Sequence, residues 1–291
     1  MSLMNYDFET RSPAPAAGHI GKLLLDSGKL TPLEAEKALQ LQKEQNLRFG
    51  EAAIQLGFIT EQDIQQALAQ QFSYPFLAEG EAGLDPRLIA AYQPFDAKVE
   101  ALRSLRSQLM LRWLNDTRRS VVLTGYEAGA GTSLTAANLA IVFSQLGERT
   151  LLIDGNLRQP QQHTLFGLNN RAGLSDLLAG RCGTEAIVRV DKLRDLSVLP
   201  AGNPAPNPQE LLSRESFREL LNQLAQQYDV ILLDSHPMQQ VADAQLIAAR
   251  AGAALIVGRQ HHSPVKGLQS VRDQLQVAGA TVLGCVLTME H

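Results

Sequence analysis

Six short apolar segments alternate with longer amphipathic stretches in the second half of the sequence, and this alternation constrains the fold most. Each segment is long enough for a strand, and most of the intervening stretches are long enough for a helix. The segments are 121–123, 151–153, 196–199, 230–233, 253–257 and 282–287. Strands that alternate with helices predict a doubly wound, mostly parallel α/β sheet.

Polar clusters follow three of these segments directly. "GAGTS" at 129–133 precedes a helix expected from about Leu134, while "DGNLR" begins at Asp154 and "DSHP" at Asp234. Ligands of such sheets bind at the carboxyl ends of the strands, so we expect the clusters to meet. Glycine-rich turns at helix starts bind anions, and serine with carboxylates suits Mg²⁺. The sequence therefore predicts a magnesium–phosphate site. The alternative is that these residues serve only as turns and caps.

The first part of the chain contains an internal repeat, in which residues 19–42 recur as 48–71. In each copy a glycine suits the end of a short helix, and a threonine then caps a longer helix with an acid three positions on. The matched pairs are Gly28 and Gly57, Thr31 and Thr60, and Glu34 and Asp63. The repeat predicts a small all-α domain ahead of the sheet.

Composition and charge narrow the function classes. A chain of 291 residues with 45% hydrophobic content can fill the cores of about two domains. A net charge of -4 with scattered basic residues gives no reason to expect nucleic acid. Cys182 and Cys285 lie in stretches that look structural, which fits a reducing compartment. Without a long apolar run or signal pattern, we expect a cytoplasmic protein with no membrane span of its own.

The repeat resembles the N-terminal domain of type II secretion and pilus-assembly ATPases, and one branch of that domain binds cyclic di-GMP. This resemblance makes cyclic di-GMP a candidate ligand, held by His19, Gly21, Gly28, Arg48, Gly50 and Gly57. The first motif position is histidine in one copy, and histidine does not reproduce the bidentate grip of arginine. The alternative is that the glycines only allow the helices to pack.

The sequence from Asp96 onward resembles the bacterial tyrosine kinases of exopolysaccharide chain-length control, a branch of the P-loop group that includes the MinD/ParA ATPases. "RQPQQHTLFGL" (158–168), "GLSDLLAG" (173–180) and "GNPAPNPQELL" (202–212) match characteristic stretches of that branch. The resemblance implies a P-loop NTPase-like sheet. It also implies the family's Glu-x-x-Arg-x-x-Arg oligomerisation motif, which corresponds here to Glu100, Arg103 and Arg106.

The same resemblance assigns roles at the site. It implies nucleotide contacts from the loop, metal ligation by a serine and two aspartates, and catalysis by the aspartates and an arginine. The loop residues are Gly129, Ala130, Gly131, Thr132, Ser133 and Leu134; the metal residues are Ser133, Asp154 and Asp234; the catalytic residues are Asp154, Arg158 and Asp234. The implied cofactors are ATP or ADP with Mg²⁺.

Four positions depart from the family pattern. Thr132 stands at the position of the Walker A lysine, and Glu127 at that of the signature lysine of MinD/ParA relatives. Asn156 replaces the second aspartate of the Walker A′ motif, and Thr288 stands near the position where the family often has an asparagine that contacts the base. The Walker lysine stabilises charge on the β- and γ-phosphates, and losing one such contact commonly costs about 10²–10³ in rate. We expect weakened nucleotide and Mg²⁺ binding and impaired phosphoryl transfer.

The sequence predicts four parts: a flexible segment at 1–18, a helical domain at 19–80, a linker at 81–95 and a kinase-like α/β domain at 96–291. We expect a cytoplasmic regulator or scaffold of exopolysaccharide biosynthesis and export. By the resemblance it would form a homo-oligomer and lie at the inner membrane through the cytoplasmic part of a polysaccharide co-polymerase. One alternative is an active ATP-dependent tyrosine kinase. Another is a MinD/ParA-like positioning ATPase, against which the missing signature lysine argues.

Overall fold

The computed structural model describes residues 17–61, 63–64, 67–68, 77 and 83–289. The chain divides into two compact units, residues 1–74 and 75–291. Most of the segment predicted to be flexible, 1–18, lies outside the described residues.

The first unit is helical in its described part and contains α1 (Ala17–Asp26), α2 (Pro32–Gln45) and α3 (Phe49–Gln55). Thr31 caps α2: the Glu34 carboxylate accepts the Thr31 N–H at 2.8 Å and the Thr31 hydroxyl accepts the Glu34 N–H. Thr60 and Asp63 form the same reciprocal pair. The predicted capping boxes are therefore confirmed in both copies of the repeat.

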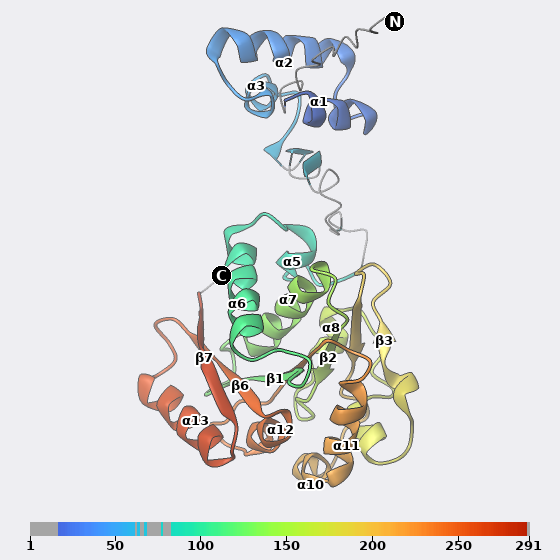
Figure 1. Ribbon diagram of the computed structural model, residues 1–291, viewed down its shortest axis with the longest axis vertical. Helices are drawn as coiled ribbons and strands as arrows, with labels where there is room; N and C mark the ends of the chain where they lie inside the picture. The colour runs from blue at the N-terminus through green and yellow to red at the C-terminus, as the bar shows by residue number, and fades with distance from the viewer. Residues whose placement is uncertain (1–16, 62, 65–66, 69–76, 78–82, 290–291) are drawn as a thin grey trace, which may run out of the picture. The chain divides into compact units, whose positions relative to one another are not determined.

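The second unit is built on one sheet whose described strands have the order β3-β4-β2-β5-β1-β6-β7 (Figure 1). Neighbouring strands are parallel except β3 and β4. The bounds are β1 (Ser120–Gly125), β2 (Thr150–Asp154), β3 (Val188–Arg189), β4 (Leu196–Leu199), β5 (Val230–Asp234), β6 (Ala253–Arg259) and β7 (Thr281–Thr288). The predicted mostly parallel sheet and all six predicted strands are confirmed. The antiparallel β3 was missed because two residues give no periodic signal.

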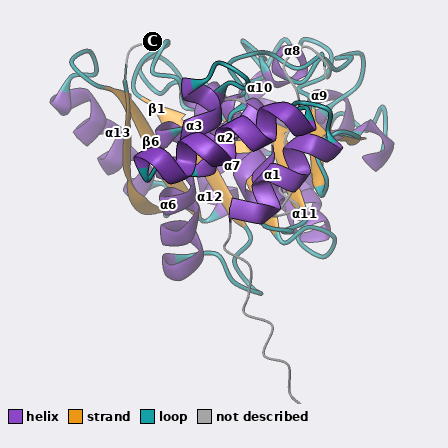
Figure 2. Cartoon of the chain, turned by 90° about the horizontal axis from the view of Figure 1, so that it is seen from above, coloured by secondary structure: helices purple, strands orange, loops and turns teal. Residues whose placement is uncertain are grey.

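Helices cover both faces of this sheet (Figure 1), and each face has its own apolar core. Figure 2 shows the strands in orange and the helices in purple. One core includes residues of α5 (Ile89–Tyr92), α6 (Ala97–Arg112), α7 (Thr132–Gln145) and α8 (Gln162–Leu165). The other includes residues of α9 (Leu174–Leu178), the short 3₁₀ turn η1 (Thr184–Ala186), α10 (Pro208–Ser213), α11 (Glu215–Leu224), α12 (Asp243–Ala251) and α13 (Val265–Val277). Successive residues of each central strand point to opposite cores, as expected for strands buried on both faces.

The described residues of the predicted linker, 83–95, belong to the packing of the second unit. Leu88, Ala90 and Ala91 are fully buried, and α5 packs beside α7. The Ala90 N–H donates to the buried side chain of Asn138 at 2.9 Å. Residues 83–95 therefore pack as part of the second unit, although the short helix α5 is too brief to give a periodic pattern in the sequence.

Candidate functional site

The carboxyl ends of β1, β2 and β5 bring the three predicted polar clusters together. Asp154, at the end of β2, lies opposite Asp234, at the end of β5, in the parallel register. Leu123 of β1 is also paired with Asp234, and β1 ends two residues later at Gly125. The glycine-rich loop leaves β1 at this point and enters α7. Parallel pairing of adjacent strands is therefore what assembles the site.

The glycine-rich loop has a backbone that favours glycine at two positions. Gly129 and Gly131 have φ angles of 83° and 82°, in the left-handed region. Gly131 is the N-cap residue of α7, which begins at Thr132, two residues before the predicted start at Leu134. The amide groups at the start of a helix of this length attract an anion through their unpaired N–H groups and the helix dipole. The loop therefore has the geometry of an anion cradle.

Thr132 contributes no charge to this cradle. Its side chain is buried, and its hydroxyl has no hydrogen-bond partner among the described residues. A Cβ placed on Gly125 would lie 3.1 Å from the Thr132 Oγ1, so the side chain packs against the end of β1. Glu127, earlier in the loop, accepts a hydrogen bond from the Ser263 hydroxyl. The two positions where the resembled family has lysine thus hold an uncharged side chain and an acid that is bound to Ser263, in the loop between β6 and α13.

Asp154 and Asp234 form a fully buried carboxylate pair. Burial raises the pKa of both carboxyls, and the negative charge of Asp234 raises the pKa of Asp154 further. The Asp154 carboxylate is also well supplied with donors. Its Oδ2 accepts the N–H groups of Gln161 and Gln162 at 3.0 and 2.9 Å, and its Oδ1 accepts the Asn156 N–H at 3.2 Å.

The Asp234 carboxylate has fewer partners. Its Oδ2 accepts a hydrogen bond from the Gln162 side-chain amide at 2.8 Å, and the Ser133 and Gln162 side chains partly oppose the rise in its pKa. Its Oδ1 is buried with no hydrogen-bond partner among the described residues. A hard cation would satisfy this oxygen, and Ser133, Asp154 and Asp234 offer the oxygen donors that Mg²⁺ prefers. The residues present therefore fit Mg²⁺, with phosphate oxygens completing its shell.

Arg158 and Asn156 are engaged within the fold. The Arg158 guanidinium binds both carboxylate oxygens of Asp243, at 2.7 and 3.2 Å, and this contact raises the pKa of Arg158. The Asn156 side chain accepts the Gln159 N–H at 3.1 Å and so stabilises the turn after β2. Asp243, the first residue of α12, was not singled out from the sequence. Its only signal was an acid in the helix-length stretch between the predicted strands 230–233 and 253–257.

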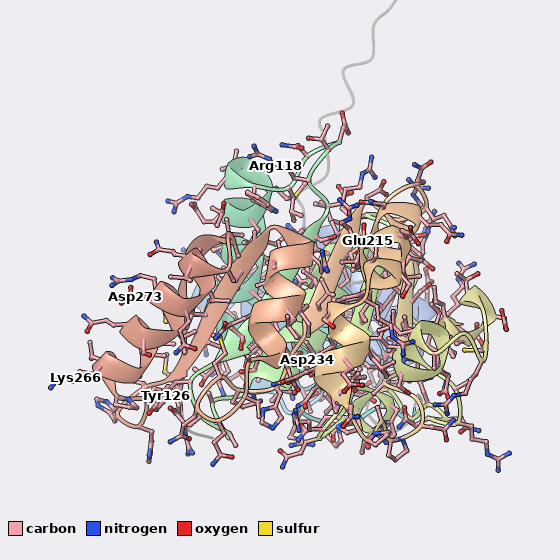
Figure 3. All side chains as sticks on the ribbon, turned by 90° about the horizontal axis from the view of Figure 1, so that it is seen from below. Arg118, Tyr126, Glu215, Asp234, Lys266 and Asp273 are labelled. Atoms are coloured by element: carbon pink, nitrogen blue, oxygen red, sulfur yellow. The ribbon has the colours of Figure 1, made fainter. Side chains whose placement is uncertain are left out.

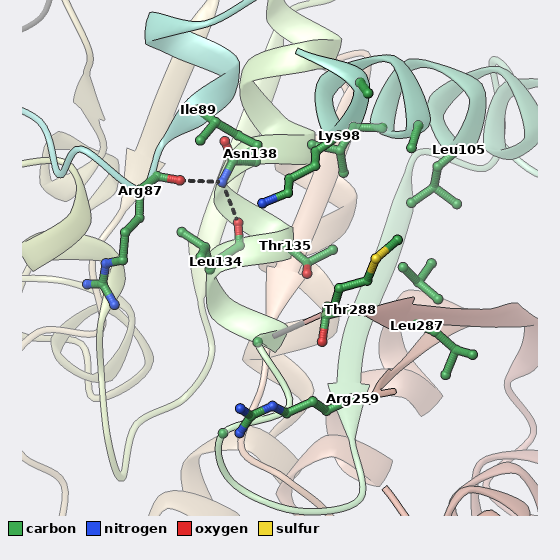
Figure 4. Close-up of a pocket in the computed structure, with 17 residues that line it drawn as sticks. Arg87, Ile89, Lys98, Leu105, Leu134, Thr135, Asn138, Arg259, Leu287 and Thr288 are labelled. Atoms are coloured by element: carbon green, nitrogen blue, oxygen red, sulfur yellow. Dashed lines mark hydrogen bonds between the residues drawn. The ribbon is translucent and has the colours of Figure 1, made fainter. Parts of the chain in front are cut away.

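A cavity of about 610 Å³ adjoins the glycine-rich loop between α6, α7 and the end of β7 (Figure 4). Gly129, Gly131, Lys98, Arg259 and Thr288 are among its lining residues. Figure 4 shows the Lys98 amine directed into the cavity, while the Arg87 guanidinium is bound to Asp85 at 2.7–2.9 Å. The lining is mostly apolar with a few polar groups, which is typical of ligand sites. Sequence reasoning missed Lys98 because the start of α6 is far from the loop in sequence.

Two basic residues that follow closely on each other at the end of β6 and the start of α13 occupy different places. Arg259 lines the cavity, whereas Lys266 is exposed at the outer end of α13 (Figure 3). Asp234 lies among the strands in the same view. Thr288 donates its hydroxyl to the Ala130 carbonyl at 2.9 Å, which joins β7 to the loop.

The predicted oligomerisation residues make contacts within their own chain. Arg103 is paired with Glu100 at 3.0 Å and also donates to the Pro94 carbonyl. Arg106 donates to the Val142 carbonyl at 2.9 Å and so links α6 to α7.

The candidate cyclic di-GMP residues of the first unit show two kinds of role. Cβ atoms placed on Gly21 and Gly50 would approach Phe49 and Ile64, the latter within 2.4 Å, so both glycines allow close helix packing. Gly28 and Gly57, with φ angles of 70° and 71°, are the left-handed glycines that follow α1 and α3. The Arg48 N–H is bound by Glu51 at 2.9 Å, and the His19 side chain is outside the description. These contacts fit the packing alternative.

Comparison with known proteins identifies the second unit. The AAA domain family matches residues 119–281. Tyrosine-protein kinase YwqD of Bacillus subtilis is 33% identical over 200 residues, which are 69% of this chain and 84% of that protein. The chain belongs to the bacterial tyrosine kinase family. The kinase domain of the Escherichia coli tyrosine kinase ETK has a TM-score of 0.69 and 30% identity, covering 73% of this chain and 84% of that one.

Longer members of the family match this chain over a smaller share of their own length. Tyrosine-protein kinase wzc of Salmonella typhimurium is 35% identical over 201 residues, which are 69% of this chain but 28% of that protein. The chain therefore spans about a quarter of the length of such relatives. Within the part of the chain that the structure describes, no helix is both long and apolar enough to cross a membrane.

Proposed function

We propose that this chain is a regulatory tyrosine-kinase-like protein of exopolysaccharide synthesis and export, which binds a nucleotide but transfers phosphoryl groups poorly. The observation that carries the proposal is the buried, uncharged Thr132 inside an otherwise complete loop. The assignment to exopolysaccharide export rests on segments 158–168, 173–180 and 202–212, which are similar to that branch of the family.

The nucleotide would bind to two parts of the site. The N–H groups of the loop and of α7 would hold the phosphates, and the adjoining cavity would take the nucleoside. Ser133, Asp154 and Asp234 would hold Mg²⁺, which when bound neutralises charge on the phosphate oxygens. Lys98 would add one positive charge from the cavity side.

Phosphoryl transfer would lack two of the groups that promote it in the family. No cation replaces the Walker lysine at position 132, so charge that builds on the β- and γ-phosphates is less stabilised there. Asn156 cannot accept a proton, and its side-chain oxygen is already bound to the Gln159 N–H. A protein of this kind would report nucleotide state by its conformation rather than by turnover.

The proposed partner is the cytoplasmic part of a membrane polysaccharide co-polymerase, with this chain as a homo-oligomer on the inner membrane through that contact. Support comes from family membership and from the Glu100, Arg103 and Arg106 motif on α6. Cyclic di-GMP binding by the repeat of the first unit stays a proposal as well.

Calorimetric titration of the purified chain with ATP, ADP and cyclic di-GMP, each with Mg²⁺, tests this function. We expect ADP and ATP to bind and magnesium-dependent ATP turnover to be very slow. A turnover number typical of kinases, about 1–100 s⁻¹, would refute the regulatory assignment. If neither ATP nor ADP binds but cyclic di-GMP does, the ligand-binding function would belong to the first unit.

A second candidate is an active tyrosine kinase whose missing cation comes from its partner. The preserved carboxylate pair favours this candidate, because a purely structural protein gains nothing from two buried carboxyls with raised pKa values. Turnover that appears only when the cytoplasmic part of the partner is added would support it.

A further inference from the structure

One buried glutamine contacts all three pieces of the candidate metal site. The Gln162 side chain is fully buried, and its amide nitrogen donates to Asp234 Oδ2 at 2.8 Å and to the Ser133 carbonyl at 3.1 Å. Its main-chain N–H donates to Asp154 Oδ2 at 2.9 Å. Gln162 therefore joins the start of α7, the end of β2 and the end of β5.

The orientation of this amide is determined by its surroundings. Both groups that face the side-chain nitrogen, the Asp234 carboxylate and the Ser133 carbonyl, are acceptors. An amide turned by half a rotation would place its oxygen against a carboxylate, so only the donor orientation is favourable. In this orientation the amide oxygen Oε1 is buried and has no hydrogen-bond partner among the described residues.

Two buried acceptors of this cluster thus have no hydrogen-bond partner among the described residues. They are Asp234 Oδ1 and Gln162 Oε1, which belong to two groups already joined by a hydrogen bond. Buried polar atoms are normally satisfied, and each exception needs an explanation. Mg²⁺ keeps several of its waters when it binds proteins, and such waters donate hydrogen bonds.

We propose that Gln162 is a positioning residue of the divalent-cation site. Its amide nitrogen holds Asp234 by Oδ2, so that Oδ1 is presented to the hydrated cation, and its own Oε1 accepts from a water of that cation. Gln162 touches neither nucleotide nor reacting atoms. The proposal rests on the proposed nucleotide and Mg²⁺ binding, which it deepens by naming the residue that orients the cation shell.

Substitution of Gln162→Met tests this role, since methionine keeps the size of the side chain and removes both polar ends. Gln161→Met is the matched control, because the Gln161 side chain is exposed and only its main-chain N–H contacts Asp154. Gln162→Asn, shorter by one methylene, is the second variant in case methionine impairs folding. Mn²⁺ affinity is read by electron paramagnetic resonance with ADP at saturation, and ADP affinity is measured separately in EDTA.

We expect Gln162→Met to weaken Mn²⁺ binding by about 10-fold or more, as for other groups that orient metal ligands, with ADP affinity in EDTA unchanged. Gln161→Met should stay within about twofold of the wild type. Equal losses in Mn²⁺ and metal-free ADP affinity would show a purely structural role and overturn the inference, as would unchanged Mn²⁺ affinity. If the wild type binds ADP but no Mn²⁺, this inference fails alone. If it binds neither, the proposed function fails with it.

Discussion

The two sides of the candidate site differ in how completely they are assembled. On the cation side, Asp154 accepts three main-chain N–H groups and Asp234 is held by Gln162. On the anion side the backbone of the loop is formed, yet its lysine position holds a threonine whose hydroxyl has no partner among the described residues. A cradle for phosphate can therefore persist without the charge that speeds phosphoryl transfer.

This difference separates binding from catalysis. Backbone N–H groups and buried carboxylates act on the ground state of a bound nucleotide, whereas the lysine matters most as charge builds in the transition state. Substitutions can change the anion side and the cation side separately, so the contribution of each side to binding and to catalysis can be measured.

Restoring the charge at the loop should have the largest effect. We expect Thr132→Lys to raise magnesium-dependent ATP turnover by about 10²–10³, the range that one preorganised electrostatic contact commonly supplies. Thr132→Met controls for the larger side chain without the charge. The measurement is steady-state release of ADP at saturating ATP.

The outcomes of this substitution discriminate between causes. A Thr132→Lys variant that binds ATP but turns it over no faster would place the defect at Asn156, and Thr132→Lys combined with Asn156→Asp would then be required. A well-folded variant that no longer binds ATP would contradict the phosphate-loop interpretation itself.

Removing charge from the carboxylate pair should stabilise the metal-free protein. Asp234→Asn can place its amide nitrogen at the Oδ1 position, which has no partner among the described residues, and keep its oxygen toward Gln162. We expect the free energy of unfolding to rise by about 1–2 kcal/mol at pH 8, since a buried repulsive charge is removed. Asp154→Asn should raise the free energy of unfolding by less. Both Asp154 oxygens accept N–H groups, and in asparagine one of them would be replaced by an NH₂ donor.

The pH dependence of this gain follows from the raised pKa values of the pair. Below about pH 3 the pair is protonated in the folded and unfolded chains alike, and it then does not lower the free energy of unfolding of the wild type. As pH rises, the unfolded carboxyls ionise first, so the wild type loses stability until the folded pair ionises. The gain of Asp234→Asn should therefore shrink from pH 8 to pH 5. Fluorescence of Trp113, the one tryptophan in the sequence, follows unfolding of the second unit.

The parts of the site that the sequence predicted are those set by strand ends. Asp154, Asp234 and the glycine-rich loop follow apolar segments directly, and parallel pairing makes them neighbours. Gln162 could not be found this way, because its side chain meets Asp234 across 72 positions of sequence. The Arg158–Asp243 pair could not be predicted for the same reason, since its residues are 85 positions apart in the sequence. Hydrogen bonds between distant side chains leave no periodic trace.

Fold prediction failed where elements are short. The two-residue β3 and the four-residue α5 give no repeat of apolar positions, although α5 is buried. The long helices and the buried strands were predicted because their patterns extend over several turns or a whole strand.

Removing a positive charge from the cavity side of the loop should have a smaller effect than adding one within the loop. We expect Lys98→Met to weaken ADP binding by about 5–10-fold, since Lys98 lines the cavity that adjoins the loop. Lys266→Met removes the same charge from the exposed start of α13 and should leave the affinity unchanged. Calorimetry with ADP and Mg²⁺ at two salt concentrations measures both. Equal losses in the two variants would indicate a general electrostatic effect rather than a contact.

The smallest effect should come from the Thr132 hydroxyl. Thr132→Val keeps the shape of the side chain and removes a buried polar group that has no partner among the described residues. Such a group stabilises nothing, so we expect the free energy of unfolding to change by less than about 1 kcal/mol, toward greater stability. ADP affinity should be unchanged in calorimetry. A marked loss of ADP affinity would mean that the hydroxyl contacts the phosphates, and position 132 would then still take part in nucleotide binding without its lysine.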